Sequence, residues 1–132
     1  MKKILSAKLA GRILIGAFIL MLIMHVLVLA KVMPSNFIWG GQVAADGSNL
    51  LQLEIVAISL TLIFTGIVAG KMKQLGSGKS NRWINIGVWI VFAYLVLNTL
   101  GNFASGVSLE TLVFGPLTII MAFCALRLAL EK

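Results

Sequence analysis

The sequence predicts an all-α protein: a transmembrane four-helix bundle that forms a single domain of 132 residues. Three observations predict it. Hydrophobic residues make up 60% of the chain and charged residues only 11%, whereas soluble domains carry about 25% charged residues. The mean hydropathy is +1.05. Four apolar runs each approach the length of about 20 residues that a helix needs to cross a bilayer. This composition argues against a soluble enzyme, a disordered chain and a nucleic-acid-binding module, so nucleic acid is not an expected partner.

Each apolar run contains few polar residues. The first is interrupted only by His25, and the second has Gln52 and Glu54 near its start. Apolar and polar residues do not alternate along the runs, which argues against a β-barrel. We therefore expect membrane-spanning helices at residues 13–30, 50–70, 83–104 and 112–130.

Positive charge is distributed unevenly over the chain. Every lysine and arginine except Lys31 lies before the first span, in or beside residues 71–82, or at the C-terminal end. Because basic residues stay on the cytoplasmic side of a membrane, both termini are expected in the cytoplasm. Residues 71–82 are then a basic cytoplasmic loop in contact with anionic lipid headgroups. The predicted location is a bacterial inner membrane, with membrane lipids as partners.

The connection at residues 31–49 is long and apolar for a loop on the outer face. Links between helices usually have about 2–8 residues, and this one contains Phe37, Ile38 and Trp39. We expect residues 34–42 to fold back onto the outer ends of the helices, with Trp39 at the level of the lipid headgroups. Two interpretations stay open: an ordinary aromatic anchor, or a lid over a pocket.

Polar residues of all four predicted spans fall in one layer near the outer face, which we call the polar layer. At about 1.5 Å per residue, His25 and Glu54 lie about 9 and about 6 Å below the outer exits of their helices. Asn98, Asn102 and Thr118 come at similar depths. Polar groups inside a membrane are costly, so we expect Glu54 to point into the bundle and to approach one of the two asparagines. Such a layer either locks helix packing or forms a binding site.

If the polar layer is a site, it is a small pocket open to the outer side. One histidine and one glutamate supply no nucleophile, metal-ligand set or cofactor motif, so no catalytic residue, metal or cofactor is expected. The inner half of the bundle is predicted to be apolar, with Arg127 extending to the cytoplasmic surface and Cys124 as a packing residue. The expected ligand-binding residues are Glu54, His25, Asn98, Asn102, Gln52, Trp39 and Thr118.

Several segments occur together in this chain: residues 34–41, Glu54 early in the second span, residues 97–102, and the closing residues 114–118 and 127–131. In these the chain resembles a family of small bacterial four-span inner-membrane proteins of unassigned function. The resemblance implies the fold and the membrane location and implies no activity. The size is also similar to that of the small multidrug resistance exporters, which are four-span dimers. Their essential glutamate lies in the first span, whereas this first span has a histidine and no carboxylate.

The sequence therefore predicts a non-enzymatic integral membrane protein with an outward-facing polar pocket for a small amphipathic or lipidic ligand. Two alternatives stay open. One is a structural or assembly protein whose polar layer only locks helix packing. The other is a small dimeric proton-coupled exporter that uses Glu54 as its proton carrier. Gly66 and Gly70, four residues apart, suit either close packing within the bundle or a homodimer.

Overall fold

The computed structural model describes residues 5–40, 42–106 and 110–131. Those ranges are mostly helical, and no strand occurs in them. Four helical stretches there are long and apolar enough to cross a membrane, which confirms the all-α class. The elements are α1 (Ala7–Leu29), α2 (Asn36–Trp39), α3 (Leu50–Ser77), α4 (Arg82–Ala104), the π-helix η1 (Glu110–Phe114) and α5 (Gly115–Ala129), which continues η1.

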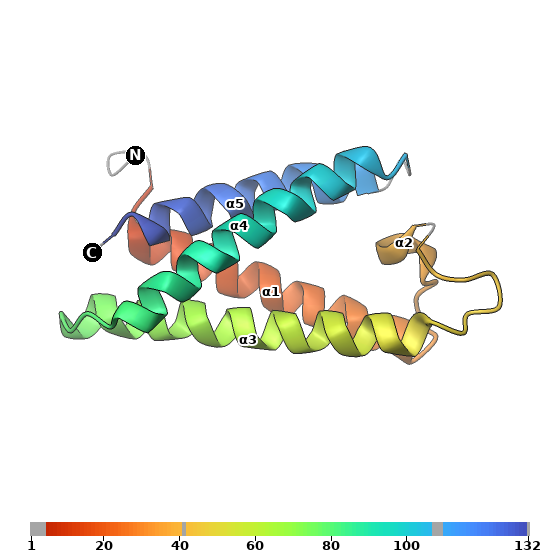
Figure 1. Ribbon diagram of the computed structural model, residues 1–132, viewed down its shortest axis with the longest axis horizontal. Coiled ribbons are helices and arrows are strands. Elements are labelled where there is room, and N and C mark those ends of the chain that lie inside the picture. Colours follow the sequence, from red (N-terminus) through yellow and green to blue (C-terminus); the bar gives the residue numbers. More distant parts are fainter. Residues whose placement is uncertain (1–4, 41, 107–109, 132) are drawn as a thin grey trace.

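The long helices form a ring in which each packs mainly on two others. α1 packs on α3 and α5, and α4 packs on the same two helices, so α1 and α4 stand diagonally opposite. Figure 1 shows that the α4–α5 pair meets the α1–α3 pair at one end of the bundle and diverges from it toward the other. We call the end that holds Leu5, residues 78–81 and Glu131 the terminal end. The opposite end, which holds residues 30–40 and 42–49, is the loop end.

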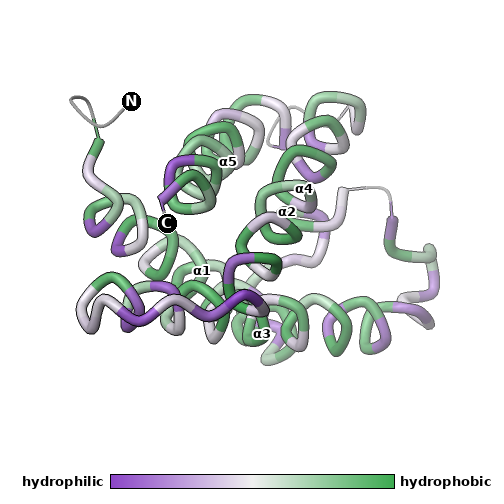
Figure 2. Tube along the Cα trace, turned by 60° about the vertical axis from the view of Figure 1, so that its left-hand side comes forward, coloured by the Kyte–Doolittle hydropathy of each residue, from purple (hydrophilic) through white to green (hydrophobic). Residues whose placement is uncertain are grey.

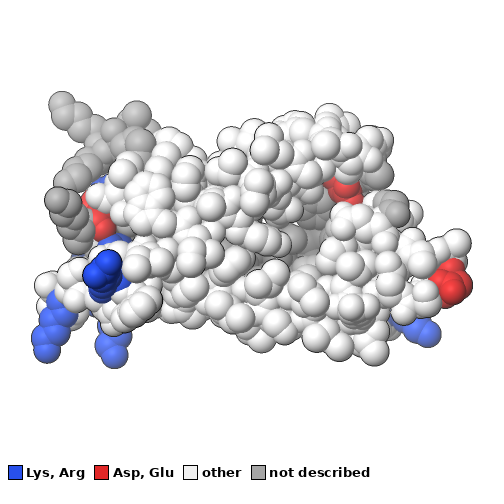
Figure 3. Space-filling model, in the orientation of Figure 1, with Lys and Arg blue, Asp and Glu red and all other residues white. Residues whose placement is uncertain are grey.

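The helices carry apolar residues on their outward faces as well as between them (Figure 2). Leu20, Val56 and Ile90 are about half exposed, which is the surface that a lipid environment requires. Charged atoms lie mainly toward the two ends of the molecule in Figure 3, with most lysine and arginine atoms at the terminal end. The buried apolar core lies between the helices and includes Leu14, Phe18, Phe64, Val68, Val88, Val91, Leu95, Met121, Cys124 and Leu128.

Two helices are longer than their predicted spans. α1 already begins at Ala7, because the side chain of Ser6 accepts a hydrogen bond from the backbone N–H of Leu9 and caps the helix. α3 continues to Ser77, so the basic loop expected at residues 71–82 is helical except for residues 78–81. Gly78 ends α3 in the left-handed conformation, with a φ of +68°. Lys71 and Lys73 are therefore helical residues, with Lys71 buried and Lys73 exposed, whereas Lys79 lies in the short link between α3 and α4.

The connection between α1 and α3 is structured by its own side chains. Asn49 accepts a hydrogen bond from the backbone N–H of Ala44 and donates one to the carbonyl oxygen of Gln42. The backbone N–H of Ser48 donates to the carboxylate of Asp46 at 3.0 Å, which holds the pKa of Asp46 below its usual value. Gly41 lies outside the described residues.

Candidate functional site

At the loop end, the carboxylate of Glu54 on α3 lies between His25 of α1 and Trp39 of α2; we call these three residues the Glu54 cluster. Oε2 of Glu54 is 2.7 Å from Nδ1 of His25. Oε1 accepts a hydrogen bond of 2.7 Å from the indole Nε1–H of Trp39. Glu54 is 0% exposed. Each carboxylate oxygen therefore has a close N–H donor when Nδ1 is protonated, which offsets the cost of burying the carboxylate.

A cavity of about 110 Å³ borders the Glu54 cluster. Its walls come from all four long helices and from α2, and Figure 3 shows the hollow on this face of the molecule. Glu54 itself lies behind His25 and Trp39 and does not line the cavity. The lining residues are mostly apolar and aromatic: Phe18, Met21, His25, Ile38, Trp39, Ala57, Leu60, Thr61, Phe64, Tyr94, Leu95, Asn98, Asn102, Phe114, Leu117, Thr118 and Met121.

Amide and hydroxyl groups from α4 and α5 line another part of the cavity wall. Nδ2 of Asn102 donates to Oγ1 of Thr118 at 3.3 Å. The Thr118 hydroxyl lies 2.8 and 2.9 Å from the carbonyl oxygens of Phe114 and Gly115 on its own helical segment. Asn98, one turn before Asn102, makes no side-chain hydrogen bond to another described residue. Its amide is therefore available to a ligand in the cavity.

The structure brings most of the expected site residues to this cavity. Five of them line it: His25, Trp39, Asn98, Asn102 and Thr118. Glu54 does not line it but is hydrogen-bonded to His25 and Trp39.

Gln52 does not belong to this group, because its side chain is exposed. It precedes Glu54 by two residues, which is about 200° of helix rotation, so the two side chains leave α3 on different faces.

Glu54 points into the bundle as expected, with 0% of the residue exposed, but no hydrogen bond joins it to Asn98 or Asn102. Both oxygens of Glu54 are bonded to residues of α1 and α2 instead, and Asn102 is bonded to Thr118. The reason is the geometry of the bundle, because α4 diverges from α3 toward the loop end (Figure 1).

The sequence reasoning missed the aromatic part of the wall. The rings of Phe18 and Phe64 have their centroids 6.2 Å apart, and those of Phe64 and Tyr94 are 4.9 Å apart in an edge-to-face arrangement. In an apolar run these residues carry no signal that separates a cavity wall from an ordinary core position. Their arrangement is visible only once the helices are packed.

Glu110 is a further buried acidic residue, with only 3% of the residue exposed. It opens η1, and its Oε1 has no hydrogen-bond partner in the described part of the chain. Pro116 offers a signal for the irregular turn, because proline has no backbone N–H to donate to the preceding turn of the helix.

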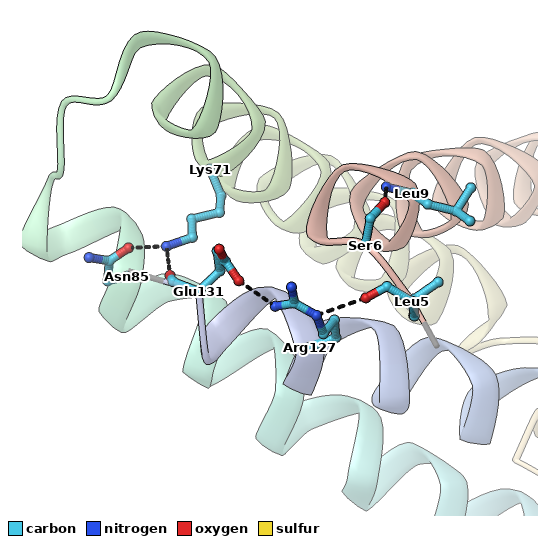
Figure 4. Close-up of polar contacts among 7 residues, drawn as sticks. All are labelled: Leu5, Ser6, Leu9, Lys71, Asn85, Arg127 and Glu131. Atoms are coloured by element: carbon cyan, nitrogen blue, oxygen red, sulfur yellow. Dashed lines mark hydrogen bonds and ion pairs between the residues drawn. The ribbon is translucent and has the colours of Figure 1, made fainter. Parts of the chain in front are cut away.

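A second buried polar group lies at the terminal end (Figure 4). Nζ of Lys71 donates to Oδ1 of Asn85 at 2.7 Å and to the backbone carbonyl oxygen of Glu131. Arg127 donates from Nε to the carbonyl oxygen of Leu5 at 2.9 Å and from Nη1 to the Glu131 carboxylate at 2.6 Å. We call these five residues the Lys71 cluster. Lys71 is 1% and Arg127 4% exposed, so the expectation that Arg127 extends to the surface is wrong.

Within the described ranges, no group of three or more His, Cys, Asp and Glu residues could hold a metal ion. The loop-end cavity offers hydrogen bonds and an apolar enclosure, which suit the binding of a small molecule. Comparison of the chain with known protein families, curated proteins and solved structures finds no match.

Proposed function

We propose that the chain is a non-enzymatic integral membrane protein that holds a small amphipathic or lipidic ligand in the loop-end cavity. The observation that carries this proposal is the cavity itself, with about 110 Å³ of space between walls from all four long helices. Protein interiors are otherwise packed to the density of organic crystals. An apolar enclosure with a few polar groups, here His25, Asn98 and Asn102, is typical of ligand pockets.

The short helix α2 supports the lid interpretation of residues 31–49. Ile38 and Trp39 both line the cavity, and Trp39 is tied to the buried Glu54 by its indole N–H. An aromatic anchor at the membrane surface needs no such inward hydrogen bond. In this proposal, α2 closes the cavity, and its release lets the ligand enter or leave.

We also propose that the terminal end faces the cytoplasm of a bacterium and the loop end faces outward. The support is charge: exposed basic residues crowd the terminal end, whereas the loop end has Lys31 (Figure 3). Cysteines placed at Asp46 and Ser77 should react with an impermeant maleimide from opposite sides of the membrane. The buried Cys124 is replaced by alanine in both variants. Labelling of both positions from outside would contradict the proposed orientation.

Native mass spectrometry of the protein, extracted in a mild detergent, tests the proposed function. We expect a small bound species on the wild-type protein and a lower occupancy on Asn98→Ala, because that amide is available to the cavity. Gln52→Ala is the matched control, since it removes an exposed amide near the same end. A wild-type protein without bound species, and variants that behave identically, would contradict the pocket.

Glu54→Gln separates the proposal from the two alternatives, because it keeps the size of the side chain and removes its charge. In a purely structural protein this change alters stability and nothing else. In a dimeric proton-coupled exporter that uses Glu54 as its proton carrier, this change abolishes pH-coupled transport in proteoliposomes while the fold stays intact. In the proposed ligand-binding protein it alters the retention of the bound species.

A further inference from the structure

The loop-end cavity is polar at several points but lacks the charges that would match an ionic headgroup. Among the described residues that line it there is no lysine, arginine, aspartate or glutamate. His25 and Tyr94 are its titratable residues, and the other polar groups are amides, hydroxyls and an indole. A buried phosphate, carboxylate or ammonium group needs a charged partner or several strong hydrogen bonds. The wall therefore favours an uncharged polar group.

The available hydrogen-bonding atoms lie on diagonally opposite helices. Nδ1 of His25 on α1 is occupied by Glu54, so Nε2 is the ring nitrogen that remains for a ligand. The amide of Asn98 on α4 has no side-chain partner among the described residues. An oxygen atom that enters between these walls can accept from the Asn98 amide, and a hydroxyl can also donate to Nε2 of a neutral His25.

The size and the aromatic lining indicate a ring. An engineered apolar cavity of about 150 Å³ binds benzene, so a cavity of about 110 Å³ holds one ring-sized group and not a whole lipid. Phe18, Phe64 and Tyr94 form a contiguous aromatic series along one side. Trp39 adds an indole from α2. Aromatic faces and edges of this kind stabilise a flat ring by stacking and edge contacts.

We infer that the end of the ligand that enters the cavity is an uncharged ring bearing a hydroxyl or carbonyl oxygen, as in phenols and quinones, with its apolar tail outside. This inference rests on the proposed ligand-binding function and names the chemical class of the ligand. The ring lies against the aromatic wall, its oxygen accepts a hydrogen bond from the amide of Asn98, and a hydroxyl also donates to Nε2 of His25. Glu54 is a positioning residue in this arrangement, because it orients His25 and Trp39 without touching the ligand.

Three probes with the same eight-carbon tail test the inference: 4-octylphenol, octyl phosphate and octylammonium. Binding is measured in non-ionic micelles by the fluorescence of Trp39, in a protein carrying W83F and W89F so that Trp39 is the one remaining tryptophan. We expect 4-octylphenol to change the Trp39 emission saturably and the two charged probes to leave it unchanged. Asn98→Leu should weaken binding of the phenol by about tenfold, the effect of losing one buried hydrogen bond. Gln52→Leu, which lies away from the cavity, should leave it unchanged.

The outcomes distinguish the inference from the proposed function. Tighter binding of a charged probe, lost in Asn98→Leu, overturns the neutral ring and leaves the pocket standing. Binding of the phenol that is equal in Asn98→Leu and wild type overturns the inference, because the probe is then not held by this wall. If no probe binds, the inference fails, and native mass spectrometry of the purified protein decides whether the pocket fails with it. If Asn98→Leu does not fold, Asn98→Ala takes its place, since it removes the same amide without adding a bulky side chain, and we expect the same weakening of about tenfold.

Discussion

The two ends of the bundle both bury charged side chains, but they use them differently. In the Glu54 cluster, side chains of α1 and α2 meet one carboxylate, and the cluster borders a cavity. In the Lys71 cluster, the two basic side chains reach backbone carbonyl groups of Leu5 and Glu131, near the two ends of the chain. The first arrangement holds a short helix over a space, and the second ties the chain ends to the bundle.

The difference lies also in which polar groups remain available. At the terminal end, Lys71 bonds Asn85 and Glu131, and Arg127 bonds Leu5 and Glu131, so the groups satisfy one another. At the loop end, His25 and Asn98 line the cavity, and neither Nε2 of His25 nor the amide of Asn98 has a side-chain partner among the described residues. A fully satisfied network rigidifies a structure, whereas available groups beside a cavity suit a ligand. The comparison predicts that stability depends more on the terminal end and binding on the loop end.

The largest effect on stability is expected at Lys71. Lys71→Met keeps much of the apolar stem but removes the ammonium group. Oδ1 of Asn85 and the carbonyl oxygen of Glu131 then lose the hydrogen bonds that Lys71 donates to them. We expect the free energy of unfolding in mixed micelles to fall by about 2–4 kcal/mol, as measured by denaturant titration. Lys73→Met is the matched control, because Lys73 is exposed on the same helix. It should change stability by less than about 0.5 kcal/mol. If the two changes lower the free energy of unfolding equally, the hydrogen bonds of the Lys71 cluster do not stabilise the fold.

The fold was predictable because apolar runs of membrane length dominate the sequence. The helix ends were less predictable, because hydropathy marks where a chain stops being apolar and not where it stops being helical. Lys71 illustrates this: as a charge it indicated a loop, yet it is a buried helical residue whose ammonium group finds partners inside the bundle. Arg127 was misread in the same way, since its partner Leu5 lies at the far end of the sequence.

The depth of the candidate site was predictable, but its pairing was not. The rise of a helix places His25 and Glu54 in one layer, and the structure joins them at 2.7 Å. Which helix Glu54 faces depends on packing angles that no spacing in the sequence encodes. The role of Trp39 depends on the path of a connection whose shape is set by local hydrogen bonds, such as those of Asn49.

A smaller effect is expected at Trp39, and it is local to α2. Trp39→Phe keeps an aromatic ring but removes the N–H that donates to Oε1 of the buried Glu54. We expect a loss of about 1–2 kcal/mol, together with faster hydrogen exchange of the amides of residues 36–39. Exchange in the middle of α1 and α3 should stay unchanged. Trp83→Phe is the control, because Trp83 is 79% exposed. Unchanged exchange in α2 would show that Glu54 does not hold this helix over the cavity.

The smallest effect concerns how closely α3 and α4 approach each other at the terminal end, where the bundle is closed. A Cβ added at Gly70 would lie 2.8 Å from Cδ1 of Ile84 on α4, whereas one added at Gly66 meets nothing within 4 Å. Alanine favours a helix over glycine at both positions by a similar amount, so the difference between the variants isolates the contact. Because the end of the Ile84 side chain can shift, we expect Gly70→Ala to be less stable than Gly66→Ala by only about 1 kcal/mol. Denaturant titration in mixed micelles measures this difference. Equal stability of the two variants would mean that α3 and α4 have room at this end, and the contrast between a closed terminal end and an open loop end would then be lost.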